Sequence, residues 1–404
     1  MPAAQTSTLS SEGANAPADP ASQRYDPLSR AARVAEAVAA PAADSVDVAA
    51  RFPHETVDAL RADRLLSMLI PTELGGAGCS ISDTAAVVER LGLSCASSAM
   101  IFAMHQIQVA SLVRHGRSPA LQALLSEIAH EQLLLASATT EIGIGGDVRS
   151  SSCAVEVAEG RFRLEKNAPV ISYGSYADVI LATARRTADS PASDQVLVAC
   201  RKADTLLEQT GEWDTLGFRG TCSPGFILKA TGSDQLILDD AYGDISAQTM
   251  LPTSHILWSS AWLGIANAAM SKARRYVQAA ARSKPGVTPP GALRLAELTV
   301  THQQFVELVH GAARRYESAL ADADALVSPS FALAMNTVKV SASQLVIDVV
   351  GGALIITGIS GYREDSDYRM GRLLRDAYGA ALMVNNDRIL NNSAQLTLMH
   401  RERY

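Results

Sequence analysis

The stretch "CAVEVAEGRFRLEKNAPVIS", residues 153–172, decides the fold of this chain, because it alternates apolar and polar residues at the period of a β-strand. Three more β-rich runs follow: "DVILATARR" at 178–186, "DQVLVACRK" at 194–202 and "DQLILDD" at 234–240. Gly, Ser, Asp and Asn separate these runs, as expected between short strands. The pattern predicts a small central β domain, a barrel or sheet, over residues 136–246.

Helical periodicity lies on both sides of this β segment. Residues 27–135 read as helices rich in Ala and Leu, with Ser82 as a candidate N-terminal cap after a Gly-rich turn. Residues 247–404 hold four long helical patterns, and the last of them is "GRLLRDAYGAALMVNNDRI" at 371–389. We expect an α+β multidomain fold with an N-terminal helical domain, a central β domain and a C-terminal four-helix bundle. Residues 1–26, rich in Ala, Ser and Pro, are predicted to be a disordered tail.

Composition excludes several classes of function. The net charge is −7 and Lys and Arg do not cluster, so nucleic acid is not an expected partner. The five cysteines are scattered without metal-ligand spacing, so we expect no metal site and reduced thiols in a cytoplasmic protein. The N-terminus lacks an apolar signal region, and no run of about 18 apolar residues without charges appears, so no membrane partner is expected.

Four segments in the predicted order resemble those of the flavin-dependent acyl-CoA dehydrogenase superfamily. They are "IPTELGGAG" at 70–78, "TTEIGIGGDV" at 139–148, "WDTLGFRGT" at 213–221 and "RLLRDA" at 372–377. The likeness runs from about residue 27 to the end of the chain. It implies a homodimer or homotetramer that binds FAD, or FMN in a monooxygenase-like member, between the β domain and the C-terminal helices.

The resemblance also implies which residues bind the flavin. Thr139, Thr140, Gly145 and Gly146 match the family's flavin loop, where glycines let backbone N–H groups approach a ligand. Ile171 and Ser172 match a segment in which a hydroxyl lies close to flavin N5, although Val170 replaces the family's usual tryptophan. Arg282, Gly358 and Gly361 match positions that contact the cofactor of a neighbouring subunit.

Four positions are implied to lie near the substrate. Arg219 and Thr221 fall in the segment where the family's β domain meets the substrate, and Ser254 and Val384 fall where relatives carry their catalytic glutamate. Removing the α-proton of an acyl thioester requires a base, and neither serine nor valine can serve as the carboxylate. Asp387 lies three residues beyond Val384 and would share its face if the helix continued, so Asp387 is the candidate relocated base.

Several interpretations remain open at this point. The first is α,β-dehydrogenation of an acyl thioester, on coenzyme A or a carrier protein, with a relocated base and an electron acceptor as partner. The second is a flavin monooxygenase, served by a flavin reductase, which needs no α-proton base. The third is a relative that binds flavin or an acyl group without turnover, and a helical scaffold without flavin ranks last. The residues favour the first narrowly.

Overall fold

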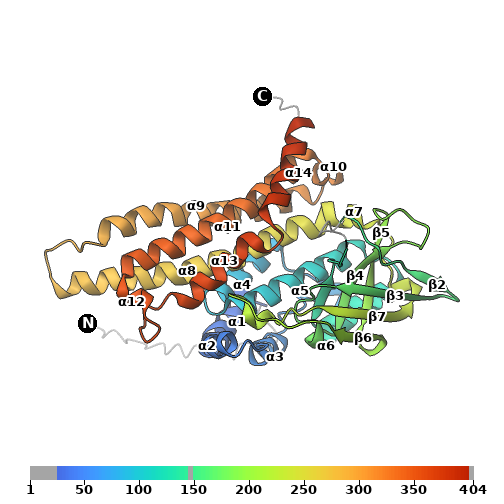
Figure 1. Cartoon of the computed structure of the whole chain (residues 1–404), viewed down its shortest axis with the longest axis horizontal. Helices are drawn as coiled ribbons and strands as arrows, with labels where there is room; N and C mark the ends of the chain where they lie inside the picture. The colour runs from blue at the N-terminus through green and yellow to red at the C-terminus, as the bar shows by residue number, and fades with distance from the viewer. Residues whose placement is uncertain (1–24, 144–148, 400–404) are drawn as a thin grey trace, which may run out of the picture.

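The structure, a computed structural model, describes residues 25–143 and 149–399 and confirms the predicted order of helices, sheets and helices (Figure 1). The N-terminal helices are α1 (Pro27–Val34), α2 (Ala40–Val48), α3 (His54–Ala62), α4 (Ile81–Gly92), α5 (Ala96–His115) and α6 (Pro119–Glu131), with a π-helical turn, Ala35–Ala39, joining α1 to α2. The cap of α4 is Ser80, which forms a reciprocal capping box with Asp83, so the prediction of Ser82 was wrong. Ser82 instead bonds to Glu317 on α9 (Ala292–Ala319).

The central domain holds two sheets that pack against each other and against the helices. A three-stranded sheet has the order β1-β4-β5, and a four-stranded sheet has the order β2-β3-β7-β6. The strands are β1 (Leu135–Ala138), β2 (Glu156–Ala158), β3 (Arg161–Ala168), β4 (Val179–Arg185), β5 (Gln195–Arg201), β6 (Thr205–Gln209) and β7 (Phe226–Ser233). The residues of β3 alternate strictly between exposed and buried, as the sequence predicts.

The C-terminal domain is built around the long helix α8. Its elements are α7 (Tyr242–Ile245), α8 (Leu251–Ser283), α9, α10 (Ala323–Leu326), α11 (Pro329–Thr357), α12 (Ile359–Tyr362), α13 (Gly371–Leu382) and α14 (Asn386–Met399). A π-helical turn at Ser246–Met250 leads into α8. Helix α11 continues unbroken through Gly351 and Gly352, and its end is marked by Gly358.

Helices α4 and α8 cross closely because glycines face each other at the crossing. A Cβ at Gly264 would lie 2.5 Å from the Glu89 carbonyl oxygen and 2.7 Å from Gly92. A Cβ at Gly92 would lie 2.6 Å from the Ala261 carbonyl oxygen. These glycines allow the backbones to touch, and they bind the N-terminal domain to the bundle.

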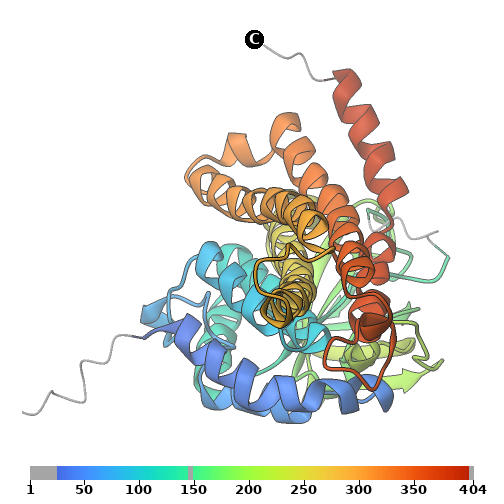
Figure 2. The ribbon, with the colours of Figure 1, turned by 90° about the vertical axis from the view of Figure 1, so that its left-hand side faces the viewer.

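The last predicted helix is in fact two helices. Residues 383–385 separate α13 from α14, so the expectation of one continuous helix over 371–389 was wrong. Helix α14 projects from the body of the molecule in both ribbon views (Figures 1 and 2). Its side chains Leu390 and Leu398 are 50% and 89% exposed.

Two helices, α5 and α11, are long and apolar enough to cross a membrane by length and composition alone. Most of α5 is buried inside the protein, and about half of the apolar window of α11 is buried. Core helices of a large bundle pass the same test, and both helices pack against their neighbours here.

Candidate functional site

Three hydroxyl groups lie in a row beside the loop that follows β3. The Ser223 hydroxyl donates to the Ser172 hydroxyl at 2.9 Å and lies 2.9 Å from the Thr221 hydroxyl. The Phe218 carbonyl oxygen, 2.9 Å from the Thr221 hydroxyl, is a second acceptor within reach of its one hydrogen. Thr221 and Ser223 are buried and Ser172 is half-buried, so the row leads from the interior toward the surface.

The predicted flavin loop begins directly after β1. Thr139 and Thr140 are both half-buried, and the Thr140 hydroxyl reaches the Val170 carbonyl oxygen at 3.4 Å. This bond is long, so the Thr140 hydroxyl remains able to bond a ligand. The contact brings Thr140 beside the segment of Ile171 and Ser172, whereas Gly145 and Gly146 lie outside the described residues.

A buried ion pair holds the start of this loop. The Lys166 ammonium lies 3.1 Å from the Glu141 carboxylate, which also accepts bonds from Ser151, Ser152 and the Cys153 N–H group. Burial tends to raise the pKa of Glu141, but the hydroxyl donors and the ammonium outweigh it and hold the pKa below its ordinary value. The loop therefore leaves β1 in a fixed direction.

Val384, which the sequence resemblance matches to the family's catalytic glutamate, lies in the break between α13 and α14. Its φ is 49°, a left-handed conformation that costs a β-branched residue strain. The Lys339 ammonium donates to the Val384 carbonyl oxygen and to the Asn386 side-chain oxygen, both at 2.7 Å, and lies 5.8 Å from the Trp262 ring. Burial lowers the pKa of Lys339 to about 8. Lys339 thus fixes the backbone at this break.

Asp387 does not lie on the same helical face as Val384. Val384 is outside any helix, while Asp387 is exposed in the first turn of α14, where its N–H group bonds to the Asn385 side chain at 2.8 Å. The expectation of a shared face was therefore wrong, because it assumed an uninterrupted helix.

Ser254, which the resemblance matches to the second position of a catalytic glutamate, makes a structural contact. Ser254 is buried in the first turn of α8 and donates to the Met250 carbonyl oxygen at 2.5 Å. Its neighbour His255 contacts the Met335 carbonyl oxygen, and burial lowers the pKa of His255 to about 4. A neutral histidine bonded to a helix carbonyl serves packing.

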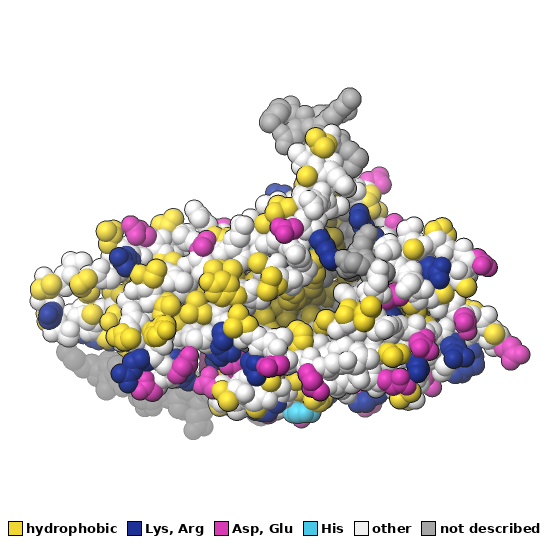
Figure 3. All heavy atoms as spheres, in the orientation of Figure 1, with side chains coloured by type: hydrophobic (Ala, Val, Ile, Leu, Met, Phe, Trp, Pro, Cys, Tyr) yellow, Lys and Arg dark blue, Asp and Glu magenta, His cyan; other side chains and the backbone are white. Residues whose placement is uncertain are grey.

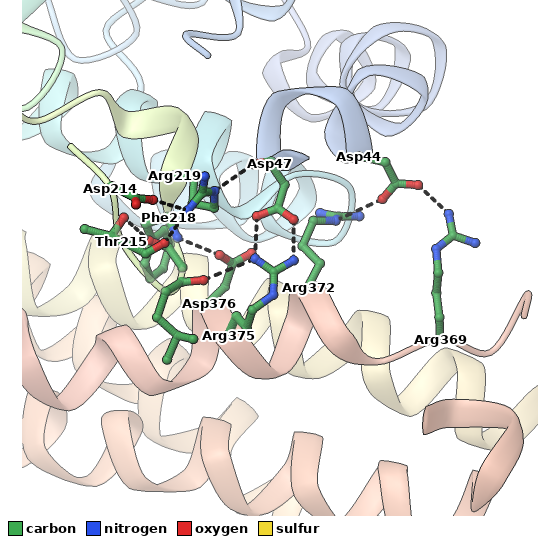
Figure 4. A network of polar contacts seen from close by, with 12 residues as sticks. Asp44, Asp47, Asp214, Thr215, Phe218, Arg219, Arg369, Arg372, Arg375 and Asp376 are labelled. Carbon is green, nitrogen blue, oxygen red and sulfur yellow. Dashed lines mark hydrogen bonds and ion pairs between the residues drawn. The ribbon is translucent and has the colours of Figure 1, made fainter. Parts of the chain in front are cut away.

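Arg219 belongs to a polar cluster that joins all three domains (Figure 4). Its guanidinium donates to the Asp47 carbonyl oxygen on α2, to Asp214 and to the Thr215 carbonyl oxygen. Arg375 on α13 pairs with the Asp47 carboxylate. These contacts occupy the Arg219 side chain, which ties the loop of residues 213–223 to α2.

In the same cluster, Asp376 on α13 accepts a bond from the Phe218 N–H group at 2.7 Å. Burial raises the pKa of Asp376 to about 6, more than the nearby cations lower it. Gly217 fits closely here, since a Cβ would lie 2.2 Å from the Arg375 carbonyl oxygen. The Arg375–Asp376 motif therefore docks the β-domain loop onto the bundle.

Arg282 and the two predicted cofactor glycines lie far from these residues. Arg282 is exposed in the last turn of α8, about 40 Å along that helix from Ser254 at 1.5 Å per residue. Gly358 ends α11, and Gly361 is in α12, at the end of the bundle opposite the β domain (Figure 1). One subunit cannot bring them to the same site as Ser172.

A hollow with a hydrophobic floor opens between the C-terminal helices and the β domain (Figure 3). Val170 and Val384 are both partly exposed, at 38% and 46%. Within residues 25–143 and 149–399, no group of three or more His, Cys, Asp or Glu side chains could hold a metal ion. The family motifs do not point to Lys166. Lys166 had a signal in the sequence, because a lysine stands on the apolar face of an alternating strand.

Comparison with known proteins assigns the family. Models of the acyl-CoA dehydrogenase N-terminal and C-terminal domains match residues 28–132 and 243–384. The chain is 27% identical over 320 residues to the probable FMNH2-dependent monooxygenase SfnC of Pseudomonas putida, covering 76% of this chain and 78% of that protein. It is 25% identical over 344 residues to cyclohex-1-ene-1-carbonyl-CoA dehydrogenase of Syntrophus aciditrophicus (strain SB), covering 84% and 80%.

The fold is also similar to that of FMN-bound TdsC from Paenibacillus sp. A11-2. The TM-score is 0.82 at 18% sequence identity, over 93% of this chain and 98% of that chain. These matches confirm the resemblance seen in the sequence motifs and in the order of domains. The chain therefore belongs to the acyl-CoA dehydrogenase family of flavin-dependent oxidoreductases.

Proposed function

We propose that the protein is a flavin-dependent monooxygenase that receives reduced flavin from a separate reductase and oxidises a small apolar molecule. The observation that carries this proposal is that neither position matched to the family's catalytic glutamate holds a carboxylate. One holds Val384, whose carbonyl is bound by Lys339, and the other holds Ser254, which is buried against a helix carbonyl. Abstraction of an α-proton needs a base at such a position, whereas oxygenation does not.

The described residues fit a flavin. Ser172 accepts a bond from Ser223 and so keeps its own hydroxyl hydrogen for another acceptor, and Thr140 beside it makes only a long bond. The hydrophobic hollow next to the β domain suits a planar aromatic ring and an apolar substrate (Figure 3). Bound reduced flavin would supply the electrons that activate oxygen. FMN is the expected form, with FAD as the form expected of a dehydrogenase.

We propose that a second copy of the chain completes the assembly, as a homodimer or homotetramer. Apolar side chains are exposed in the last turns of α11, in α12 and in α13: Ile355 at 62%, Ile359 at 70%, Tyr362 at 75%, Tyr378 at 51% and Leu382 at 75%. An exposed set of this size favours a protein contact. Arg282 and Gly361 lie at this end of the bundle, where they would reach the flavin of the partner.

The test determines which compound reduces the bound flavin. Under anaerobic conditions, we expect acyl-CoA thioesters to leave the flavin oxidised and a flavin reductase with NADH to bleach it. Admission of oxygen to the reduced protein should then oxidise an added apolar substrate. Bleaching by an acyl-CoA alone would overturn this proposal, and failure of the purified protein to bind either FMN or FAD would overturn any flavin function.

Dehydrogenation of an acyl thioester is the second candidate, supported by the match to a cyclohexenecarbonyl-CoA dehydrogenase over 84% of the chain. It requires a relocated base, for which Asp387 is the candidate, on an acyl group carried by coenzyme A or a carrier protein. Asp387→Asn should abolish anaerobic bleaching in that case. An unchanged bleaching rate in this variant would exclude Asp387 as the base.

A further inference from the structure

We propose that Thr221 and Ser223 form a hydroxyl relay that orients the Ser172 hydroxyl hydrogen toward the flavin. This inference rests on the flavin site proposed above and extends it to two residues that do not touch the cofactor. The Thr221–Ser223 and Ser223–Ser172 oxygen distances are both 2.9 Å, longer than the commonest hydroxyl separation but within hydrogen-bonding range. Thr221 and Ser223 are therefore positioning residues, and Ser172 is the residue that meets the ligand.

The direction of the bonds decides what Ser172 can do. Each hydroxyl has one hydrogen, so in the relay Thr221 donates to Ser223 and Ser223 donates to Ser172. The Phe218 carbonyl oxygen, 2.9 Å from the Thr221 hydroxyl, and the Thr221 carbonyl oxygen, 3.3 Å from the Ser223 hydroxyl, are the competing acceptors. The Ser172 oxygen is thus already an acceptor, and its own hydrogen is left to donate outward. A hydroxyl that accepts one bond becomes a stronger donor in the next, an effect of perhaps 10–30% per bond.

Burial keeps this direction fixed. Thr221 and Ser223 are 3% and 2% exposed, so water does not compete for their hydroxyl groups. The backbone around them is also held, because the Tyr173 N–H group donates to the Thr221 carbonyl oxygen at 2.8 Å and the Ile171 N–H group donates to the Pro224 carbonyl oxygen at 3.0 Å. The two loops therefore move as one unit with Ser172 at its edge.

The base of the relay is anchored on the C-terminal bundle. The Phe218 carbonyl oxygen lies 2.9 Å from the Thr221 hydroxyl, and the Phe218 N–H group donates to the buried Asp376 carboxylate on α13 (Figure 4). Phe218 and Cys222 both have left-handed backbone conformations, with φ of 49° and 42°. Strained residues of this kind persist where the surroundings fix them, and they are frequent at functional sites. The loop thus links α13 to the position of Ser172.

The test measures the hydrogen bond that flavin N5 accepts in the oxidised complex. Wild-type protein and variants are saturated with 15N-labelled FMN, and the 15N resonance of N5, which responds to hydrogen bonding, is recorded together with the dissociation constant. Ser172→Ala should shift this resonance toward that of flavin without a donor and weaken binding by up to about tenfold. Ser223→Ala should shift it in the same direction by a smaller amount, with Ser172 still present.

Three further variants separate the relay from general damage. Thr221→Val should shift the resonance while Thr221→Ser, which keeps the hydroxyl, should restore the wild-type position. Ser175→Ala, at an exposed serine three residues beyond Ser172, should change nothing. Retained binding with a wild-type N5 resonance in Ser223→Ala and Thr221→Val would overturn the relay while leaving the flavin site intact. Absence of FMN and FAD binding by the wild-type protein would instead overturn the proposed function itself.

Discussion

Breaking the buried Glu141–Lys166 pair should destabilise the β domain far more than breaking an exposed pair on the same domain. Lys166 is fully buried, and apart from Glu141 its ammonium contacts only the Thr183 carbonyl and hydroxyl oxygens among the described residues, at 2.9 and 3.3 Å. Removing one partner of such a pair leaves a buried charge and costs about 3–5 kcal/mol. The exposed pair Lys229–Glu208, at 2.9 Å, is the matched control and should be worth at most about 1 kcal/mol.

The two partners of the buried pair should not be equivalent. In Lys166→Met the Glu141 carboxylate keeps its bonds from Ser151, Ser152 and the Cys153 N–H group, so the loss should lie near about 3 kcal/mol. In Glu141→Gln the buried ammonium loses its only counter-charge in the described network, so the loss should approach about 5 kcal/mol.

Native-state hydrogen exchange of the β4 amides measures this loss locally. A change of about 3 kcal/mol corresponds to a fall in protection of roughly 100- to 200-fold. Because the folded pKa of Glu141 lies below its unfolded value, its contribution is present above the unfolded pKa and is lost as pH falls through the folded pKa. The difference between wild type and Lys166→Met should therefore shrink in acid, below about pH 4. Equal effects of Lys166→Met and Lys229→Met would refute the argument from burial.

Two other substitutions test the packing between domains. Gly264→Ala should destabilise the protein by about 1–3 kcal/mol in urea unfolding, because its Cβ meets the backbone of α4, whereas Gly311→Ala, with nothing within 4 Å, should be neutral or slightly stabilising. The pKa of Asp376 is raised to about 6, so the folded state binds a proton more tightly than the unfolded state and stability should fall as pH rises from about 4 to 6. Asp376→Asn should remove this decrease in stability between about pH 4 and 6. If the variant shows the same decrease, another group causes it.

The sequence predicts the fold well because the signals are local and repeated. The change from a helical period to strict alternation in β3 marks the β domain without any long-range information. The start of α4 could also be predicted, since Ser80 and Asp83 have the spacing of a capping box, whereas Ser82 lies inside the first turn of the helix.

The sequence holds one local signal for the break after α13, the capping residue Asn385, whose side chain accepts a bond from the Asp387 N–H group at 2.8 Å. Residues 383–385 contain neither glycine nor proline, and valine disfavours the left-handed conformation that Val384 adopts. That conformation coincides with a bond from Lys339, which is 45 residues earlier in the chain. Arg219 is a similar case, because its partner Asp47 lies on a different domain. Contacts between distant residues contribute to both positions, and a local sequence pattern does not reveal such contacts.

The surroundings of Val384 fit the proposed oxygenation, because no carboxylate stands at this position of the chain. The buried Lys339 ammonium lies 2.7 Å from the Val384 carbonyl oxygen. Here the ammonium binds the backbone of Val384 and the side chain of Asn386, so the cation is satisfied without an acid. Among the described residues, the polar groups of the β domain that we propose to face the flavin are the hydroxyls of Thr140 and Ser172, which donate hydrogen bonds but do not remove a carbon-bound proton near neutral pH. A site of this kind can hold and orient a flavin, and the apolar hollow beside it then determines which molecule is oxidised.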